Sequence, residues 1–351
     1  MGRDVSRERS ARAVLLIGGF LVAVVISELL LRIFGLGYGG VHMVSSDVLH
    51  HVHPPDYRFV SYHRSREHGG HVVYYDEAGR RAHPDQSAVD LTGYEGAVAV
   101  MGDSFVEALQ VAHEDSFVGR LQTAANGHTP VQNYGTSSYG PALYLLQWRH
   151  QIRQQRPSYI FLMLFGNDVR NDAEMTAIAQ VDSRGEIVAV SGAEQTWFAR
   201  VARSTYLARL VRKVQLQLVW AWEHWGEETG ESFLDFLEEN PDITDLTDGY
   251  LQQLVRETRE VGTQLVLLAV PSKEDTLRRA ARTTRRAFHD KVRVWAEQHR
   301  VPFVDLATPF LVAAEAGARL FFPRDIHFTE EGHRVVADVL LSAYPKVFTG
   351  E

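Results

Sequence analysis

Near-continuous apolar runs of strand length are the feature that most constrains how this chain can fold. Four such runs occupy residues 97–101, 159–165, 265–270 and 301–306. A strand with apolar side chains on both faces must be covered on both, and this is typical of strands in parallel sheets. The runs therefore predict a parallel sheet that lies between two layers of helices.

Helical patterns fill the intervals between these runs. Residues 113–125 and 141–154 are predicted helices, and residues 131–133 begin a further strand. The basic stretch 273–299 is predicted to be helical, and Thr329 is predicted to cap a closing helix that ends near Leu341. Because strands and helices alternate throughout, we expect one α/β domain over residues 93–349.

The predicted strands end in clusters of small and polar residues. The first strand stops at Gly-Asp-Ser, residues 102–104, and the second at a block rich in glycine and serine, residues 133–140. The most apolar strand stops at Gly-Asn-Asp, residues 166–168, and Asp-Ile-His at 325–327 precedes the closing helix. Ligands bind outside the carboxyl ends of parallel strands, so we expect the four clusters to converge on one edge of the sheet.

Ser104, His327 and Asp325 are the candidates for nucleophilic chemistry. A serine hydroxyl is a weak nucleophile until a base removes its proton. His327 is the candidate base, and Asp325, two residues before it, is placed to orient the imidazole. Asn167 offers a neutral amide that can donate to developing negative charge. The alternative is that Asp325 and His327 belong to a helix-capping segment without a catalytic partner.

The four clusters together resemble the four blocks of the SGNH (GDSL-type) hydrolases, in the family's order. The resemblance spans about residues 95–345. It implies a three-layer α/β/α flavodoxin-like fold and acyl-ester chemistry, and we expect neither a cofactor nor a metal.

The resemblance also implies a role for individual residues. Ser104 would be the nucleophile, His327 the base and Asp325 the residue that orients the imidazole. The Ser104 amide and the Asn167 side chain would line the oxyanion hole. Two departures from the family pattern stand out: Gly166 directly precedes Asn167, and Ser138 aligns with the glycine whose amide completes the hole. Gly135 and Gly140 are the alternatives for that donor.

Neighbouring residues of these blocks are assigned supporting roles. Asp103 is expected to hold the turn, and Asp168 to bond the backbone around Ser104, with a role as an alternative acid left open. We expect His333 to be a solvated surface residue of the closing helix. Met101 and Phe105 are expected in the core.

The amino terminus carries an apolar segment, uncharged over residues 13–27, that predicts a membrane anchor. Residues 13–34 would form a helix about 33 Å long, which is enough to cross the hydrocarbon core. We expect Glu28 and Arg32 to pair with each other at its outer boundary. A cleaved signal peptide and a buried core helix are the alternatives.

The charge around this segment predicts its orientation. Four arginines precede it: Arg3, Arg7, Arg9 and Arg12. Only Arg32, near its end, and then Arg58 follow closely. The positive-inside rule then places residues 1–12 in the cytoplasm. The rest of the chain would lie outside, so we expect a single-pass protein of the inner membrane with a periplasmic catalytic domain.

Residues 35–92 are predicted to be a polar leader that packs on the main domain. Residues 71–75 are a predicted strand, followed by a turn at 76–79. The histidines His42, His50, His51 and His53 could suggest a metal site. Because no carboxylates accompany them at fixed helical spacing, we expect a solvated loop instead.

Residues 173–262 interrupt the alternation and are predicted to be a helical insertion. Residues 203–225 read as one helix with a stripe of apolar side chains, and residues 226–249 as an acidic surface connector. The helix would cover the sheet as a cap. Alternatively, it would be a lid over the substrate or lie on the membrane, because basic residues and tryptophans suit an interface.

Composition excludes several classes of function. The net charge of −8 gives no electrostatic footprint for nucleic acid. The chain has no cysteine, which excludes disulfides and a cysteine nucleophile. The resemblance and the predicted anchor together imply a membrane-anchored serine esterase that would act on an O-acylated glycan or a lipid ester. The alternatives are an O-acetyltransferase for an envelope polysaccharide and a catalytically silent glycan-binding module; the oligomeric state stays open.

Overall fold

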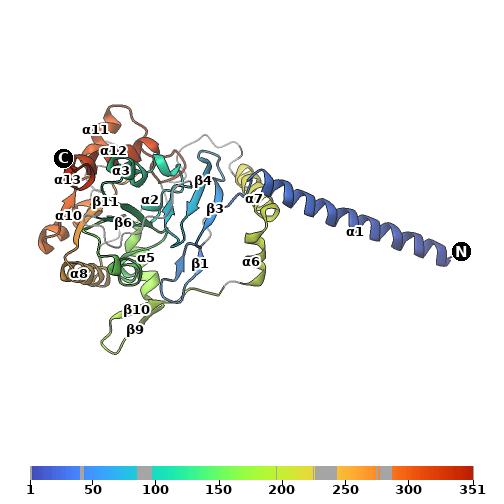
Figure 1. The fold of residues 1–351 in the computed structure, drawn as a ribbon, viewed down its shortest axis with the longest axis horizontal. Coiled ribbons are helices and arrows are strands. Elements are labelled where there is room, and N and C mark those ends of the chain that lie inside the picture. The colour runs from blue at the N-terminus through green and yellow to red at the C-terminus, as the bar shows by residue number, and fades with distance from the viewer. Residues whose placement is uncertain are drawn as a thin grey trace.

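A long amino-terminal helix projects from an α/β body in the computed structural model (Figure 1). The structure describes residues 2–39, 43–84, 97–194, 196–223, 225, 243–273, 276 and 287–350. His42 lies outside these ranges. So do most of the predicted acidic connector and the first part of the predicted basic helix.

The strands are β1 (Val44–Ser45), β2 (His51–Val52), β3 (Tyr57–Tyr62), β4 (Gly69–Tyr75), β5 (Arg81–Ala82), β6 (Val98–Gly102), β7 (Val131–Gly135), β8 (Tyr159–Leu164), β9 (Ala179–Val181), β10 (Ile187–Val190), β11 (Gln264–Ala269) and β12 (Phe303–Val304).

The α-helices are α1 (Gly2–Ile33), α2 (Ser104–Glu107), α3 (Phe117–Ala125), α4 (Pro141–Gln147), α5 (Asn167–Thr176), α6 (Trp197–Ser204), α7 (Tyr206–Glu223), α8 (Asp245–Glu260), α10 (Ala287–His299), α11 (Ala307–Glu315), α12 (Glu330–Ala343) and α13 (Pro345–Phe348). Shorter turns are η1 (His113–Asp115), the π-helical η2 (Trp148–Ile152) and η3 (Arg153–Gln155).

The central sheet has the strand order of the predicted flavodoxin-like fold. Its strands run β12-β11-β8-β6-β7-β5-β4-β3, and β12, β11, β8, β6 and β7 are mutually parallel. Counted along the chain, these five parallel strands have the order 2-1-3-4-5, whose ligand site lies at the switch point between the first and third strands. Here those strands are β6 and β8, so the switch point lies between the loops that follow them.

Apolar side chains on both faces of the strands explain the three layers. In β6, Val98 and Val100 belong to one buried cluster, whereas Ala99 and Met101 belong to the other. Helices α4, α8 and α10 cover the second face, and α3, α11 and α12 cover the first. The predicted core positions Met101 and Phe105 are both buried. The structure thus bears out the parallel sheet with helices on both faces.

The polar leader extends this sheet with antiparallel strands. Strand β5 pairs with β7 through Arg81 and Asn133, β4 pairs with β5, and β3 forms the outer edge. The predicted strand at 71–75 is therefore part of β4. The buried guanidinium of Arg81 donates to the carbonyls of Glu107, Ala108 and Val111, which fixes the leader to the segment after α2.

Two expectations about local structure are wrong. Residues 301–306 contribute only the two-residue strand Phe303–Val304, whereas the predicted helix at 141–154 is present and changes to π-helical and then 3₁₀ geometry after Gln147. The insertion at 173–262 is not wholly helical, because β9 and β10 form an antiparallel hairpin. Short strands of this kind have too few residues to show a clear period in the sequence.

Several histidines that were expected in solvent are buried. His51 and His53 are almost fully covered, and His51 donates through Nε2 to the Ser137 carbonyl at 2.9 Å. His333 is also buried, between the rings of Phe117 and Phe328. Histidine has an apolar body, so packing decides whether it is exposed, and its polar character alone does not.

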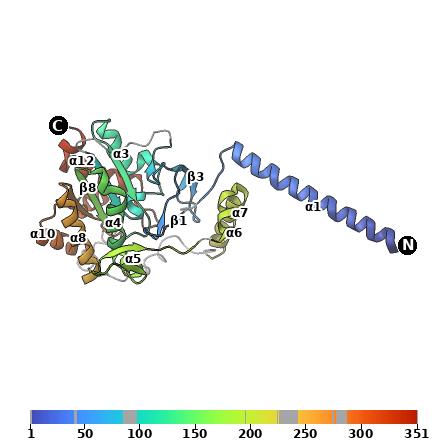
Figure 2. The same ribbon diagram turned by 60° about the horizontal axis from the view of Figure 1, so that its bottom comes forward.

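The predicted helix over 203–225 is interrupted at Thr205, where α6 ends and α7 begins. The Glu28 carboxylate of α1 accepts from the backbone amides of Tyr206 and Leu207, at 3.0 and 2.8 Å. This contact caps α7 from a distant part of the chain, so no local signal marks the break. The prediction that the apolar stripe covers the sheet is also wrong: α7 lies outside the α/β body, beside the end of α1 (Figure 2).

Candidate active site

Ser104 lies at the carboxyl end of β6, where a sharp turn leads into α2. The Asp103 carboxylate accepts from the Phe105 amide at 2.9 Å and so caps this short helix. Gly102 is required here, since a Cβ would lie 2.4 Å from Cγ2 of Val106. The turn leaves the Ser104 side chain partly accessible, while its neighbours are buried.

The structure brings Ser104, His327 and Asp325 into one hydrogen-bonded chain. Ser104 Oγ lies 2.7 Å from Nε2 of His327, and Nδ1 of His327 donates to Oδ1 of Asp325. The same carboxylate oxygen accepts from the His327 backbone amide at 3.0 Å. A carboxylate can only accept, so Nδ1 carries the proton and Nε2 faces the serine hydroxyl as an acceptor.

The electrostatics suit a base beside a permanent anion. Burial by itself would lower the pKa of His327, but the Asp325 carboxylate raises it above the ordinary value. Burial would raise the pKa of Asp325, yet the charge of His327 and the hydrogen bonds from His327 and His68 hold it far below its usual range. Asp325 therefore stays ionised, and an imidazolium at His327 is stabilised where it forms.

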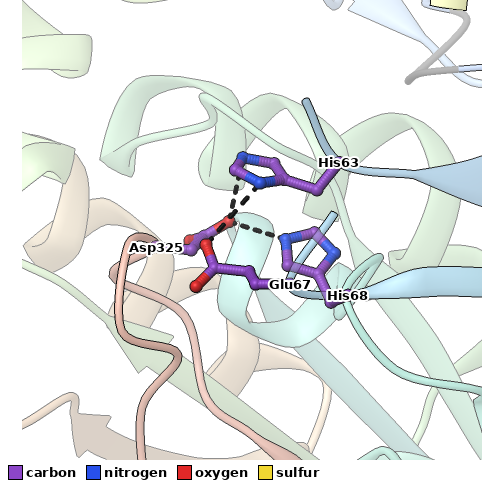
Figure 3. Close-up of side chains that lie close together, drawn as sticks. All are labelled: His63, Glu67, His68 and Asp325. Atoms are coloured by element: carbon purple, nitrogen blue, oxygen red, sulfur yellow. Dashed lines mark hydrogen bonds and ion pairs between the residues drawn. The ribbon is translucent and has the colours of Figure 1, made fainter. Parts of the chain in front are cut away.

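The leader supplies a second set of contacts to Asp325 (Figure 3). His68 donates through Nε2 to Oδ2 of Asp325 at 3.0 Å, and its ring stacks on that of His63, with the centroids 4.5 Å apart. Glu67 accepts from the Arg324 amide at 2.8 Å, which ties the leader to the residue before Asp325. Both carboxylate oxygens of Asp325 are thus held, one by His327 and one by His68.

His63, Glu67, His68 and Asp325 also form a possible metal-ligand set, because their donor atoms lie within 4.8 Å of one another. Two imidazoles and two carboxylates suit Zn²⁺. A cation there would replace the hydrogen bond between His68 and Asp325 and would draw charge from the carboxylate that faces His327. Hydrogen bonding accounts for the arrangement without an ion, and the expectation of no metal stays a prediction.

A buried lysine fixes the loop that carries Asp325. The Lys273 ammonium donates to the carbonyls of Phe322 and Pro323 at 2.6 and 2.7 Å, and to the Asp325 carbonyl at 3.3 Å. On the other side, the Phe105 ring lies against His327, with the centroids 4.9 Å apart. The loop is therefore held by charge on one side and by aromatic packing on the other.

Asn167 follows β8 and is the first residue of α5. Its side chain interacts with the Asp103 carboxylate. Burial raises the pKa of Asp103 to about 6, although the Phe105 amide and Asn167 oppose the rise. Asn167 follows β8 and Ser104 follows β6, so both lie at the switch point between the two central strands, as the sequence predicts. The amino terminus of α5 adds the positive end of its helix dipole to the site.

Asp168 behaves differently from its expected role. Its carboxylate accepts from the Phe165 amide at 3.1 Å and from the Tyr144 hydroxyl at 3.2 Å, and it is buried. Burial, with Asp103 nearby, raises its pKa well above the ordinary value. Asp168 thus ties the start of α5 to the residue after β8 and to helix α4, and the expected bond to the backbone around Ser104 is replaced by these contacts.

The glycine- and serine-rich block wraps around α2. A Cβ on Gly135 would lie 2.2 Å from the Glu107 amide, and one on Gly140 would lie 2.7 Å from the Asp168 carbonyl, so both glycines permit close packing. The Gly135 amide donates to Oδ1 of Asn133 at 2.8 Å and is already engaged. Ser138 is exposed and has a positive φ of 66°.

Glu107 is the buried centre of the contacts beneath this block. It accepts from the Ser137 amide at 2.9 Å, lies 2.9 Å from Nε2 of His53 and also accepts from the Tyr75 hydroxyl. Burial would raise the pKa of Glu107, but His53 and these hydrogen bonds lower it to about 2. A carboxylate from α2 and a histidine from the leader therefore fix the backbone of the second block.

The sequence predictions give no supporting role to Glu107, His68 or Lys273, and they place His53 in a solvated loop. None follows a predicted strand directly, and their partners lie far away in the chain. The one local signal is Glu107, an acidic residue three positions after Ser104 in an otherwise apolar segment.

The model of the GDSL-like Lipase/Acylhydrolase family matches residues 100–335. No curated protein matches this chain.

Three solved structures illustrate the likeness in fold. LAE5, an α/β hydrolase enzyme from the metagenome of Lake Arreo, Spain, is 16% identical with a TM-score of 0.45, covering 74% of this chain and 99% of its own. A catalytic mutant of Axe2, an acetylxylan esterase from Geobacillus stearothermophilus, is 16% identical with a TM-score of 0.43, covering 72% and 94%. The acetyl xylan esterase AlAXEase is 12% identical with a TM-score of 0.42, covering 70% and 98%. Since these values are low, it is the family match that identifies the chain.

Proposed function

Because the chain belongs to the GDSL-like lipase/acylhydrolase family and is an ester hydrolase, we propose that Ser104, His327 and Asp325 are its catalytic triad. The observation that carries the proposal is the hydrogen-bonded chain from the Ser104 hydroxyl through both ring nitrogens of His327 to Asp325. A nucleophile, a base and a residue that orients the base are thereby within direct reach of one another.

The acylation step follows from these contacts. The Ser104 oxygen attacks the acyl carbonyl while Nε2 of His327 takes the hydroxyl proton, and Asp325 stabilises the imidazolium. His327 then gives that proton to the leaving alkoxide, which departs as an alcohol. The product of this half-reaction is an acyl ester on Ser104.

Deacylation repeats the same proton transfers with water as the nucleophile. His327 removes a proton from water, the hydroxide attacks the acyl-enzyme, and the proton returns to Ser104 as the acid leaves. An intermediate oxyanion forms in both halves, and we assign its donors to the Ser104 amide, the Asn167 side chain and a second-block amide. For that third donor, Ser138 is favoured over Gly135, because the Gly135 amide already donates to Asn133.

The substrate and the location of the enzyme belong to the same proposal. Residues Ala11–Ile33 form a helix long and apolar enough to cross a membrane, and its most apolar 18-residue window has no residue buried inside the protein. With arginines before this segment, the catalytic domain would lie outside the cytoplasm. An enzyme held there meets acylated glycans and lipid esters of the envelope, which we propose as its substrate class.

Hydrolysis of a nitrophenyl acetate ester by the purified full-length chain tests the triad. We expect Ser104→Ala to lower the rate by about 10⁴-fold or more, because the acyl-enzyme can no longer form. Ser191→Ala is the matched control, since that hydroxyl lies in the β9–β10 region and donates to the Asp47 carbonyl. Equal rates for the wild type and Ser104→Ala would contradict the proposal, and turnover only with a sugar acceptor would favour acyl transfer over hydrolysis.

The orientation is tested by a reporter fused to the carboxyl terminus. Alkaline phosphatase folds to its active form only outside the cytoplasm, so the fusion is expected to be active. An inactive phosphatase, together with a fluorescent protein that is bright in the same position, would contradict the extracytoplasmic placement.

A further inference from the structure

Helix α7 exposes its apolar face, unlike an ordinary surface helix. An amphipathic helix on a globular protein packs its apolar stripe against the core. In α7 the apolar stripe faces away from the protein: Val211, Val214 and Leu218 are exposed, and Trp222 is 82% exposed. Trp225, just beyond the helix, is 87% exposed and continues the same stripe at helical spacing.

The opposite side of α7 holds the helix to the protein through cationic and aromatic side chains. Lys213 lies over the Tyr38 ring, 3.6 Å from its centroid, and Arg209 lies over the Tyr57 ring at 5.2 Å. The Arg324 guanidinium lies over the Trp220 ring, 4.5 Å from its centroid. These inward residues recur at helical spacing, so the helix is fixed by one face and its apolar face is left outward.

The start of α7 is joined to the end of the apolar helix α1. Glu28 caps the first amides of α7, while Arg32 donates to the Ser204 carbonyl at 2.7 Å and lies over the Tyr206 ring. Glu28 and Arg32 also pair with each other at 2.8 Å. Both residues lie in the last turns of α1, so α7 begins at the level where α1 emerges from its apolar stretch (Figure 1).

We propose that α7 lies on the outer surface of the lipid bilayer that α1 spans, with Val211, Val214, Leu218, Trp222 and Trp225 inserted among the lipid headgroups and upper acyl chains. The proposal rests on the membrane anchor included in the proposed function. The occupant is a lipid surface because the stripe is continuous with the exit of a membrane-spanning segment and carries tryptophans, which favour the interface. The exposed cation Arg212, next to Val211 on α7, suits anionic headgroups.

The inward face of α7 connects this lipid surface to the catalytic loop. Arg324, which lies over Trp220, directly precedes Asp325, and Gln217 donates to the His63 carbonyl at 3.5 Å. The site is therefore carried close to the bilayer, on the side of α7 that faces away from lipid. This geometry favours esters presented at the membrane surface, such as acylated lipids or lipid-linked glycans, over esters free in solution.

Because the chain has no cysteine, single-cysteine variants carry one nitroxide label each without further changes. The full-length chain is reconstituted in vesicles of phosphatidylethanolamine and phosphatidylglycerol, and collisions with oxygen, which dissolves in acyl chains, are compared with collisions with a water-soluble nickel chelate. Val211→Cys tests α7 and Val22→Cys tests α1. Val312→Cys on α11 is the matched control, since Val211 and Val312 are 59% and 62% exposed on helices.

We expect oxygen collisions to dominate at positions 22 and 211, and nickel collisions to dominate at position 312. If nickel collisions dominate at position 211, as at 312, while oxygen collisions dominate at position 22, the interfacial placement of α7 is overturned and the anchor stands. Nickel collisions dominating at all three positions would overturn both. A label at 211 that neither reagent reaches would mean that a protein surface covers the stripe, which also contradicts the proposal. None of these readouts depends on ester hydrolysis.

Discussion

Two regions of the molecule build the candidate site, and they do so in different ways. Ser104 and Asn167 lie at the ends of adjacent parallel strands, and His327 approaches from the loop before α12. His68 and His53 come from the antiparallel leader, which joins the far edge of the same sheet. The first region supplies the groups that would react with substrate, whereas the second holds those groups in position.

The difference between the regions also appears in their electrostatics. Contacts at the sheet edge raise the pKa of His327 and so tune a proton acceptor. The leader contacts lower the pKa of carboxylates and keep them ionised, as His53 does for Glu107. Variants in the first region should therefore reduce the chemical step by orders of magnitude, and those in the second should have smaller effects on rate or act on stability.

Asp325→Asn is expected to have the largest effect among the variants that separate the two regions. An amide can donate to His327 and stabilise the wrong tautomer, so the rate should fall by about 10⁴-fold. Because Asp325 is what raises the pKa of His327, the residual activity should also persist to lower pH, where the wild type loses its neutral base. The measurement is the pH profile of kcat/KM; an acid limb that moves upward would contradict this assignment.

Asn167→Ala is expected to reduce turnover by about 10²–10³-fold, with a smaller change in KM, because an oxyanion donor acts mainly in the transition state. Asn171→Ala, one turn later on α5, serves as the control, since Asn171 is buried in the same helix. Kinetics with a nitrophenyl ester give both constants. Equal losses in the two variants would mean that α5, and not the Asn167 amide, was disturbed.

His68→Ala should lower kcat by about ten- to a hundredfold, since a hydrogen bond to a charged group contributes about 1.5–3 kcal/mol. His68→Gln retains an N–H that can donate toward Asp325 and should recover part of the rate. His71→Ala controls for damage to the leader, because its imidazole lies 3.0 Å from the Leu109 carbonyl. If His68→Gln recovers no activity, and His68→Ala and His71→Ala lower kcat equally, His68 does not position Asp325.

Glu107→Gln is expected to act on stability more than on rate. Breaking the buried pair with His53 should lower the free energy of unfolding at neutral pH by about 3 kcal/mol. The folded-state pKa of Glu107 is about 2, below its ordinary value of 4.5, so its contribution is present above pH 4.5 and is lost as the pH falls toward 2. Urea unfolding of both proteins at pH 7 and pH 3 should show the difference shrink; a constant difference would contradict the ion pair.

The same contrast explains what the sequence could reveal. The blocks at Ser104 and Asn167 follow apolar runs directly, so parallel topology brings them to one edge, whereas the block at His327 directly precedes the closing helix. Their order along the chain also matches a family pattern, so the parallel sheet and the identity of the candidate triad were both predictable. These features depend on short stretches of sequence and on one general property of α/β sheets.

The leader and α7 could not be predicted in this way. His53 and His68 look like solvated histidines until β3, β4 and β5 join the sheet, and this pairing depends on partners far along the chain. The break at Thr205 likewise depends on Glu28, whose carboxylate caps α7 from the end of α1. Periodicity correctly grouped the apolar residues of α7 but could not show whether that stripe faces the core or faces away from it.

Reaction of the full-length chain with a fluorophosphonate tests the central claim most directly, because the reagent forms a stable bond only with a serine that a neighbouring base activates. Mass spectrometry of the digested protein should find one phosphonylated serine, Ser104, with labelling much slower in His327→Ala. The labelled protein should no longer hydrolyse esters. A chain that hydrolyses esters while Ser104 stays unmodified, or that carries the label on a different serine, would contradict the account.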